Sequence, residues 1–154
     1  SSEINVNGRK IRVFSNHLQT TNFNTNKKRI LQLGIDNNVQ TLYETIVQLK
    51  HNCQIRADQA DLIRSKIQSD TLPIILCSDL NDTPASYAYH RLKGNLADGF
   101  MTHGKGYGYT YKGLLKLFRI DYIFYSKHFE GVEYISPCGN WSDHKPVIMT
   151  LHLP

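Results

Sequence analysis

The chain has 154 residues, of which 40% are hydrophobic and 20% charged, and its 18 Lys and Arg residues against 13 Asp and Glu residues give a formal net charge of +5. This length is typical of a single domain, and the composition is that of a globular protein rather than a disordered or fibrous one. The apolar runs are only a few residues long, which excludes a transmembrane helix, and the first residues lack the basic and apolar regions of a signal peptide. The three cysteines form no Cys-x-x-Cys pair, which argues against a disulfide framework or a zinc site.

The first half of the chain predicts a strand, a loop and one long helix. Residues 10–18 begin with alternating apolar and polar side chains, which is typical of a strand. Residues 19–26 are rich in Thr and Asn and are therefore predicted to form a loop. Over residues 39–67 apolar side chains recur every three or four positions, so we expect one amphipathic helix with Asn37 or Asn38 as its N-cap.

The second half predicts mostly strands. A break in the long helix near Asn52 remains open, and Pro73 is expected to end that helix. Residues 74–77 are apolar on both sides of the pleat, which is typical of a strand buried on both faces. Residues 86–92, which follow a proline, are predicted to form a short helix. Four further strands are predicted over residues 108–111, 117–125, 132–135 and 146–153, the first two joined by a tight turn at Lys112 and Gly113.

Two segments carry basic residues without acidic ones. No Asp or Glu occurs between Glu3 and Asp36, or between Asp98 and Asp121. The second segment interleaves basic side chains with tyrosines, namely Lys105, Lys112, Lys116 and Arg119 with Tyr107, Tyr109 and Tyr111. Such segments suit a polyanionic or phosphorylated partner, although each one taken alone is explained equally well as solvated loop charge.

Short polar clusters stand where the predicted strands end. They are Asn16-His17, residues 78–84, residues 119–122, residues 142–146 and the single Thr110. In α/β sheets, residues just beyond strand ends converge on a common crevice. The three Asp, one Asn and two His residues of these clusters would then form a hard-cation site with proton-transfer groups beside it.

Each cluster also has an ordinary structural explanation. Asp79 and Asn81 suit an Asx turn, and His17 taken alone is more simply a core histidine. The pair at 143–144 suits an ordinary loop. Asp121 is harder to explain in this way, because an ionised carboxylate within an apolar strand is costly unless it is paired.

Four motifs follow one another in a definite order. They are N-H-L at residues 16–18, D-L-N-D-T-P-x-S at 79–86, R-I-D-Y-I-F at 119–124 and S-D-H-x-P-V at 142–147. In this order they resemble the endonuclease/exonuclease/phosphatase superfamily, which includes DNase I and the exonuclease III-type nucleases. The resemblance covers residues 13–153 and departs from the family at Ser78, where the family usually has Gly. The motifs are most similar to those of secreted or periplasmic members from bacteria of the Bacteroides type, so a bacterial source is implied and the location is left open.

The resemblance implies a mixed α/β chain that forms half of a DNase I-like two-sheet sandwich. Family members relate two such halves by a pseudo-two-fold axis, and residues 1–154 match the C-terminal half, expected as one mixed, mostly antiparallel sheet with one long and one short helix. The Asn and the magnesium-binding Glu that the family carries before its N-H-L strand have no counterpart here. We therefore expect the apolar face of the sheet to be covered by the absent N-terminal half or by a second copy in a homodimer.

The activity that the resemblance implies is hydrolysis of a phosphate ester by a longer parent protein, with Mg²⁺ or Mn²⁺ as cofactor and with this chain alone inactive. The implied catalytic residues are His17, Asp79, Asn81, Asp121 and His144. Asp79 would activate the attacking water, and Asn81 would hold the phosphate or that water. The two histidines would donate to phosphate oxygens, and Asp121 would fix the tautomer of His144.

The resemblance also implies metal ligands and substrate contacts. The metal ligands are Asp79, Asn81 and Asp143. The substrate contacts are Asn16, Thr110, Tyr111, Lys112 and Arg119. Nucleic acid, a phospholipid headgroup and a small phosphate ester all suit the basic segment, in which Tyr rings would stack on bases at ~1–3 kcal/mol each. The alternative function is a non-catalytic module that binds an anion or a protein in the same crevice.

Overall fold

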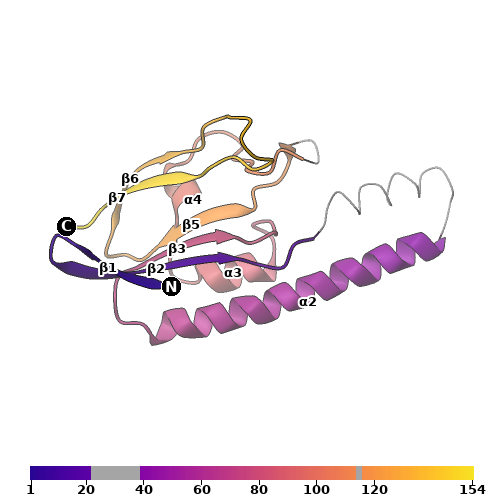
Figure 1. Ribbon diagram of the computed structural model, residues 1–154, viewed down its shortest axis with the longest axis horizontal. Coiled ribbons are helices and arrows are strands. Elements are labelled where there is room, and N and C mark those ends of the chain that lie inside the picture. The colour runs from indigo at the N-terminus through magenta and orange to yellow at the C-terminus, as the bar shows by residue number, and fades with distance from the viewer. Residues whose placement is uncertain (22–38, 114–115) are drawn as a thin grey trace.

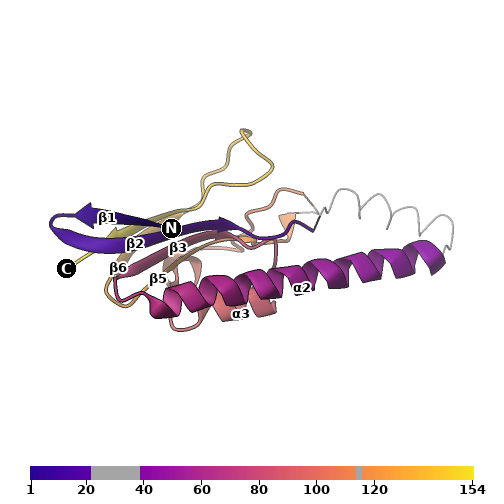
Figure 2. The same cartoon turned by 60° about the horizontal axis from the view of Figure 1, so that its bottom comes forward.

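The structure is a computed structural model that describes residues 1–21, 39–113 and 116–154. The two N-cap candidates Asn37 and Asn38 and most of the predicted loop over residues 19–26 lie outside these ranges. The described residues form layers, in which a five-stranded sheet lies on two helices (Figure 2). A smaller two-stranded sheet packs on the opposite face of the large one.

Five strands form the main sheet in the order β1-β2-β3-β5-β4, and Figure 1 labels all of them except β4. They are β1 (Ser2–Val6), β2 (Arg9–His17), β3 (Ile74–Asp79), β5 (Asp121–Tyr125) and β4 (Ala97–Asp98). Only β2 and β3 run parallel, and the other neighbouring pairs are antiparallel. The prediction of a mixed, mostly antiparallel sheet in an α/β chain is therefore confirmed.

Strand β1 lies outside the predicted elements. It pairs with β2 through a two-residue turn at Asn7 and Gly8, whose φ angles are 52° and 83°. Asn-Gly is the preferred sequence for such a turn, because both residues tolerate a positive φ. The turn signal is therefore present in the sequence, but all residues of β1 are exposed and no burial pattern accompanies it.

The long predicted helix is confirmed as α2 (Val39–Ser69), which has no break at Asn52. Its 31 residues span about 46 Å at 1.5 Å per residue, so the helix crosses the sheet and continues past it (Figure 1). The short helix α3 (Tyr87–Lys93) contacts α2, and the hydroxyl of its N-cap Ser86 accepts a hydrogen bond from the Tyr89 N–H at 3.2 Å. None of the described helices combines the length and the apolar character that a membrane span requires.

Two very short elements follow α3 and were outside the prediction. They are β4 and the five-residue helix α4 (Gly99–His103). The Asp98 carboxylate starts this helix, because it accepts hydrogen bonds from the N–H groups of Phe100 and Met101 at 2.9 and 3.3 Å. Neither element is long enough to show a period in its apolar residues.

The main core lies between the large sheet and the helices α2 and α3. Its buried side chains include Phe14, Leu76, Tyr122 and Phe124 from the strands and Ala60, Ile67, Tyr89 and Leu92 from the helices. Residues of β3 alternate between buried and half-buried. The predicted strand at residues 74–77 is thus confirmed, but only the face toward the helices is fully buried, because the other face meets a smaller layer.

That smaller layer is a second sheet made of β6 (Glu130–Ile135) and β7 (Ile148–His152), which are antiparallel. Its contact with the main sheet is a small cluster in which Met149 of β7 packs near Ile11 and Tyr125. The two strands predicted at 132–135 and 146–153 are confirmed with shifted ends. The expectation of a single sheet is wrong, because β6 and β7 pair only with each other among the described residues.

The predicted strand over residues 108–111 is absent. Gly106 and Gly108 have φ angles of 75° and 73°, which an extended strand does not adopt. Tyr111 forms only an isolated bridge, with His144. The segment is therefore an irregular connection whose hydrogen bonds go to two different parts of the chain.

The predicted strand over residues 117–125 is shorter than expected. Lys116 has a φ angle of 58°, and the regular strand β5 begins only at Asp121. Asp121 therefore stands at the end of a strand, not inside an apolar one. At this position the ionised carboxylate does not have to be buried in the interior of an apolar strand.

Candidate active site

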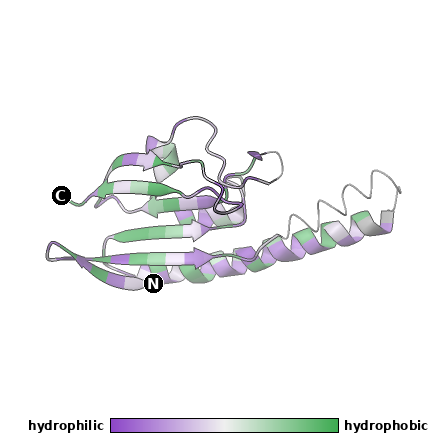
Figure 3. Ribbon diagram, turned by 45° about the horizontal axis from the view of Figure 1, so that its top comes forward, coloured by the Kyte–Doolittle hydropathy of each residue, from purple (hydrophilic) through white to green (hydrophobic). Residues whose placement is uncertain are grey.

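Three polar residues lie side by side at one end of the main sheet. His17 is the last residue of β2 and Asp79 the last residue of β3, and since these strands are parallel, the two residues are paired in the register. Asp121 is the first residue of the antiparallel β5 and is paired with Asp79 from the other side. Figure 3 shows hydrophilic colour at the arrowheads of β2 and β3. Register alone thus brings together residues from three distant parts of the sequence.

His144 joins these residues from the loop before β7. Its Nδ1 lies 2.9 Å from Asp121 Oδ2 and 3.9 Å from Asp79 Oδ2. His17 Nε2 lies 3.5 Å from the same oxygen, Asp79 Oδ2. We call His17, Asp79, Asp121 and His144 the strand-end cluster.

Burial and charge set the protonation of this cluster. Burial raises the pKa of the Asp79 carboxyl, and the nearby Asp121 carboxylate adds to the rise while the Asn81 N–H opposes it. The hydrogen bond to Asp121 raises the pKa of His144, although its partial burial acts in the opposite direction. His144 therefore keeps its proton to a higher pH than an ordinary histidine, and Asp79 takes up a proton more readily than an ordinary aspartate.

The loop after β3 shows that an Asx turn and a place in the site are compatible. Asp79 Oδ1 accepts a hydrogen bond from the Asn81 N–H at 2.9 Å, which leaves Oδ2 toward the two histidines. Asn81 has a φ angle of 48° and is buried, and its side-chain nitrogen donates to the Leu18 carbonyl at 3.1 Å. This bond ties the loop to the residue that follows β2.

The sequence pattern did not reveal that α2 holds the same loop. Arg56 is only 3% exposed, and its Nε donates to Asp82 Oδ2 at 2.9 Å. Its Nη1 donates to Thr21 Oγ1 at 2.8 Å, and that hydroxyl in turn contacts the Asn81 carbonyl. The helical spacing placed this face of α2 toward the core, but only the tertiary structure shows the loop that Arg56 reaches.

Three of the predicted substrate contacts lie around the cluster. Asn16 donates through Nδ2 to Ser78 Oγ at 2.6 Å, which joins β2 to β3 just before their polar ends. Tyr111 is buried, and its ring meets the ring of His144 edge-on with centroids 5.4 Å apart. Lys112 Nζ donates to the carbonyl oxygens of Gly139 and Ser142, which ties it to the loop that carries His144.

The other two predicted substrate contacts, Thr110 and Arg119, have interior partners. Thr110 is fully buried, and its hydroxyl oxygen accepts hydrogen bonds from backbone N–H groups. Arg119 is 7% exposed and donates through Nη1 to both carboxylate oxygens of Asp98, at 3.0 and 2.8 Å. Each residue follows a segment that contains glycines or a predicted turn. No regular spacing of apolar residues in these segments predicted that either side chain is buried.

A divalent cation fits the strand-end cluster. Asp79, Asp121 and His144 each offer one ligand atom, and these atoms lie within 4.8 Å of one another. The Asp121 carboxylate raises the pKa of its neighbour Asp79, and a cation between the two would relieve that repulsion. Two carboxylates match the preference of Mg²⁺ and Mn²⁺ for oxygen ligands.

Of the three predicted metal ligands, the structure places only Asp79 in this group. Asp79 belongs to the group that offers cation ligands, and Asn81 lies two residues beyond it in the same loop. Asp143 precedes His144 but is exposed, and its carboxylate accepts a long 3.3 Å hydrogen bond from Ser142 Oγ. Asp121 takes the place beside Asp79 because the strand register puts it there.

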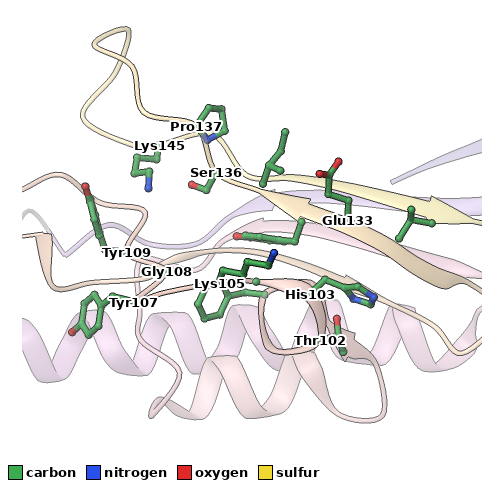
Figure 4. Close-up of a pocket in the computed structure, with 15 residues that line it drawn as sticks. Thr102, His103, Lys105, Tyr107, Gly108, Tyr109, Glu133, Ser136, Pro137 and Lys145 are labelled. Carbon is green, nitrogen blue, oxygen red and sulfur yellow. The ribbon is translucent and has the colours of Figure 1, made fainter.

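A groove runs between α4, residues 104–109 and β6, and it shares Lys145 with a smaller pocket that Asp121 and His144 line. It has a volume of about 1190 Å³ and reaches Lys145, the residue after His144. Figure 4 shows Lys105, Tyr107, Tyr109 and Lys145 around it. The Lys145 ammonium lies 4.5 Å from the centroid of the Tyr109 ring. The groove thus combines aromatic surface with positive charge beside the cluster.

Comparisons with known proteins agree with this geometry. A family model described as the Endonuclease/Exonuclease/phosphatase family matches residues 15–144. An endonuclease/exonuclease/phosphatase from Beutenbergia cavernae shares 20% sequence identity with the chain over 98% of the chain and 38% of its own length, with a TM-score of 0.65. The protein of the same description from Bacteroides vulgatus shares 26% identity over 66% of the chain and 45% of its own length, with a TM-score of 0.56.

A third similar structure is a mannosyl-6-phosphatase from Bacteroides thetaiotaomicron, with 19% identity over 95% of the chain and 52% of its own length and a TM-score of 0.61. The chain therefore spans about half the length of these structures or less. No curated protein matches it. The resemblance that the four motifs indicated, including the similarity to Bacteroides proteins, is confirmed.

Proposed function

This chain belongs to the endonuclease/exonuclease/phosphatase family, and on that premise we propose that it is the C-terminal part of a metal-dependent phosphoesterase. Proteins of this family are hydrolases that act on phosphate esters and generally depend on a metal ion. The observation that carries the proposal is the convergence of Asp79, Asp121 and His144 at one end of the sheet.

In the proposed reaction, Asp79 orients the attacking water and accepts its proton. His144 is held through Nδ1 by Asp121, so Nε2 is the ring nitrogen left to donate to a non-bridging phosphate oxygen. His17 faces Asp79 from the other side and donates to the same phosphate.

Asp79 and Asp121, with the side chains of Asn81 and Asp143 on the adjoining loops, would hold Mg²⁺ or Mn²⁺, which supplies positive charge for the phosphate oxygens when bound. Asn81 holds the phosphate or the water beside it. These side chains supply few fixed oxygens, so tight octahedral coordination needs further ligands from outside this chain.

We also propose that the rest of the domain covers exposed apolar side chains of these two sheets. Apolar side chains on β1, β6 and β7 are 37–58% exposed, namely Ile4, Val6, Val132, Ile135 and Ile148. An N-terminal half of the same family domain would bury them and would also add metal ligands. A second copy of this chain, packed as a homodimer, is the other occupant that this surface suits.

Hydrolysis by the full-length protein that carries this chain tests the proposed function. We expect metal-dependent cleavage of at least one ester in a panel of a sugar phosphate, an aryl phosphodiester, an oligonucleotide and a phosphocholine lipid, and loss of that cleavage with a chelator. The 154-residue chain by itself is expected to be inactive. If the full-length protein cleaves nothing but binds an anionic polymer, the function is that of a non-catalytic binding module instead.

We predict that the groove binds the part of the substrate beyond the scissile phosphate. Replacing Lys105 and Lys145 together by alanine should raise KM about tenfold and change kcat less than threefold, because each exposed charge contact contributes up to ~1 kcal/mol and a tenfold change corresponds to about 1.4 kcal/mol. Steady-state kinetics at several salt concentrations measure this. Lys66→Ala on an exposed face of α2 is the matched control. An unchanged KM in the double variant would show that the groove does not bind the substrate.

A further inference from the structure

Thr110 connects the two chain segments that bring Asp121 and His144 together. We propose that its hydroxyl oxygen is the positioning group that holds the Asp121 carboxylate in place for His144. The proposal rests on the proposed function of the strand-end cluster. It assigns Thr110 a role inside the protein, in place of the substrate contact that the sequence resemblance implied.

The first connection runs from Thr110 to the segment that carries Asp121. Thr110 Oγ1 accepts hydrogen bonds from the N–H groups of Ile120 and Asp121, at 3.0 and 3.1 Å. The Thr110 N–H donates to the Phe118 carbonyl at 2.9 Å. Thr110 is fully buried, so water cannot replace its hydroxyl without a local rearrangement.

Strand pairing explains why this hydroxyl is needed. On the side of β5 away from β3, the partner strand β4 reaches only Phe124 and Tyr125. The backbone at Ile120 and Asp121 lies beyond the end of β4, and the Thr110 side chain takes the place of a strand there. Because Thr is branched at Cβ, its χ1 angle is restricted and its oxygen keeps a definite position.

The second connection runs from the same segment to the loop that carries His144. The Thr110 carbonyl accepts a hydrogen bond from the Lys145 N–H at 2.7 Å. The Lys112 N–H donates to the Asp143 carbonyl at 2.8 Å, and Tyr111 forms its bridge with His144 between these two bonds. The backbone on both sides of His144 is thus attached to residues 110–112.

The 2.9 Å contact between Asp121 Oδ2 and His144 Nδ1 therefore joins two segments that share one buried support. Loss of the Thr110 oxygen would leave two backbone N–H groups without their acceptor and would let the start of β5 move. A displacement of about 1 Å in such a site costs ~10²-fold in rate. The substrate does not contact Thr110, so its binding should change little.

The experiment compares Thr110→Val, which keeps the shape but removes the oxygen, with Thr110→Ser, which keeps the oxygen. In the full-length protein we expect Thr110→Val to lower kcat about 10–100-fold with KM within threefold of wild type, and Thr110→Ser to stay within about fivefold of wild type. Ser126→Ala is the matched control, because Ser126 Oγ accepts a bond from the Ile74 N–H at the opposite end of the sheet. Its kcat should stay within threefold of wild type.

Amide hydrogen exchange measures the same connection without using activity. In Thr110→Val the amides of Ile120 and Asp121 should exchange at least tenfold faster, and in Thr110→Ser they should stay protected. If the two amides exchange faster in Thr110→Val but the wild-type protein hydrolyses no ester, the proposed function is wrong, while the hydrogen-bond connection through Thr110 is still supported. An unchanged kcat or unchanged exchange in Thr110→Val would overturn the proposal.

A second pair of variants covers the case in which Thr110→Val does not fold. Thr110→Ala and Thr110→Ser both lack the methyl group and differ only in the oxygen. If Thr110→Ala lowers kcat about 10–100-fold and Thr110→Ser does not, the result supports the role of the oxygen. Equal losses in both would mean that the methyl group supplies the effect by packing, and the proposal would be wrong.

Discussion

Replacing Asp79 or His144 by alanine in the full-length protein is expected to lower kcat by several powers of ten. A positioned base contributes ~10²–10⁴-fold and a preorganised donor to developing charge ~10²–10³-fold. Both side chains are 18–27% exposed at the sheet end, so their truncation should leave the fold intact. Initial rates on the cleaved ester, with circular dichroism as a check of folding, give the result.

Asp121→Asn should reduce kcat nearly as much as His144→Ala. An amide in place of the carboxylate would no longer stabilise the doubly protonated ring of His144, so the ring would keep one proton and, with that proton on Nδ1, Nε2 could not donate. Asp58→Ala and His128→Ala serve as controls, because both remove the same side-chain types from exposed positions. Rates within threefold of wild type for both Asp79→Ala and His144→Ala would show that the strand-end cluster is not the catalytic site.

The largest effect on stability is expected from Asp98→Ala. The side chain of Asp98 is 1% exposed, and it accepts hydrogen bonds from Arg119, from the Tyr89 hydroxyl and from the first N–H groups of α4. Removing one partner of a buried ion pair costs ~3–5 kcal/mol, because the other charge stays buried without compensation. At ~2–4 °C per kcal/mol for a domain of 150–250 residues, Tm should fall by about 10 °C.

Thermal unfolding of the full-length protein measures this change. Asp61→Ala is the matched control, because it breaks an aspartate–arginine pair with Arg91 whose side chains are 47% and 38% exposed. Solvent and salt screen such a pair, so Tm should hardly move. Arg119→Met added to Asp98→Ala should recover part of the loss, since the uncompensated charge is then gone. Equal Tm changes in Asp98→Ala and Asp61→Ala would contradict the structural role given to Asp98.

Local patterns in the sequence determined much of the fold. The helix α2 was predictable because its apolar residues follow the helical period over many turns, and β3 because a short apolar run follows Pro73. The residues of the strand-end cluster were predicted through the order of four motifs, since His17, Asp79 and His144 taken alone each had an ordinary explanation. The spacing of apolar residues and the residues within each motif are properties of neighbouring positions, and the sequence contains them directly.

The tertiary structure decided which polar residues meet and which are buried. Asp121 lies beside Asp79 because β3 and β5 pair in that register, whereas Asp143 remains exposed one residue from His144. Thr110 and Arg119 looked like surface residues of a basic segment, but in the structure both side chains are buried. Strand register and burial depend on contacts between residues that are 11 to 62 positions apart in the sequence. No local period or composition carries that information, so only the folded chain shows it.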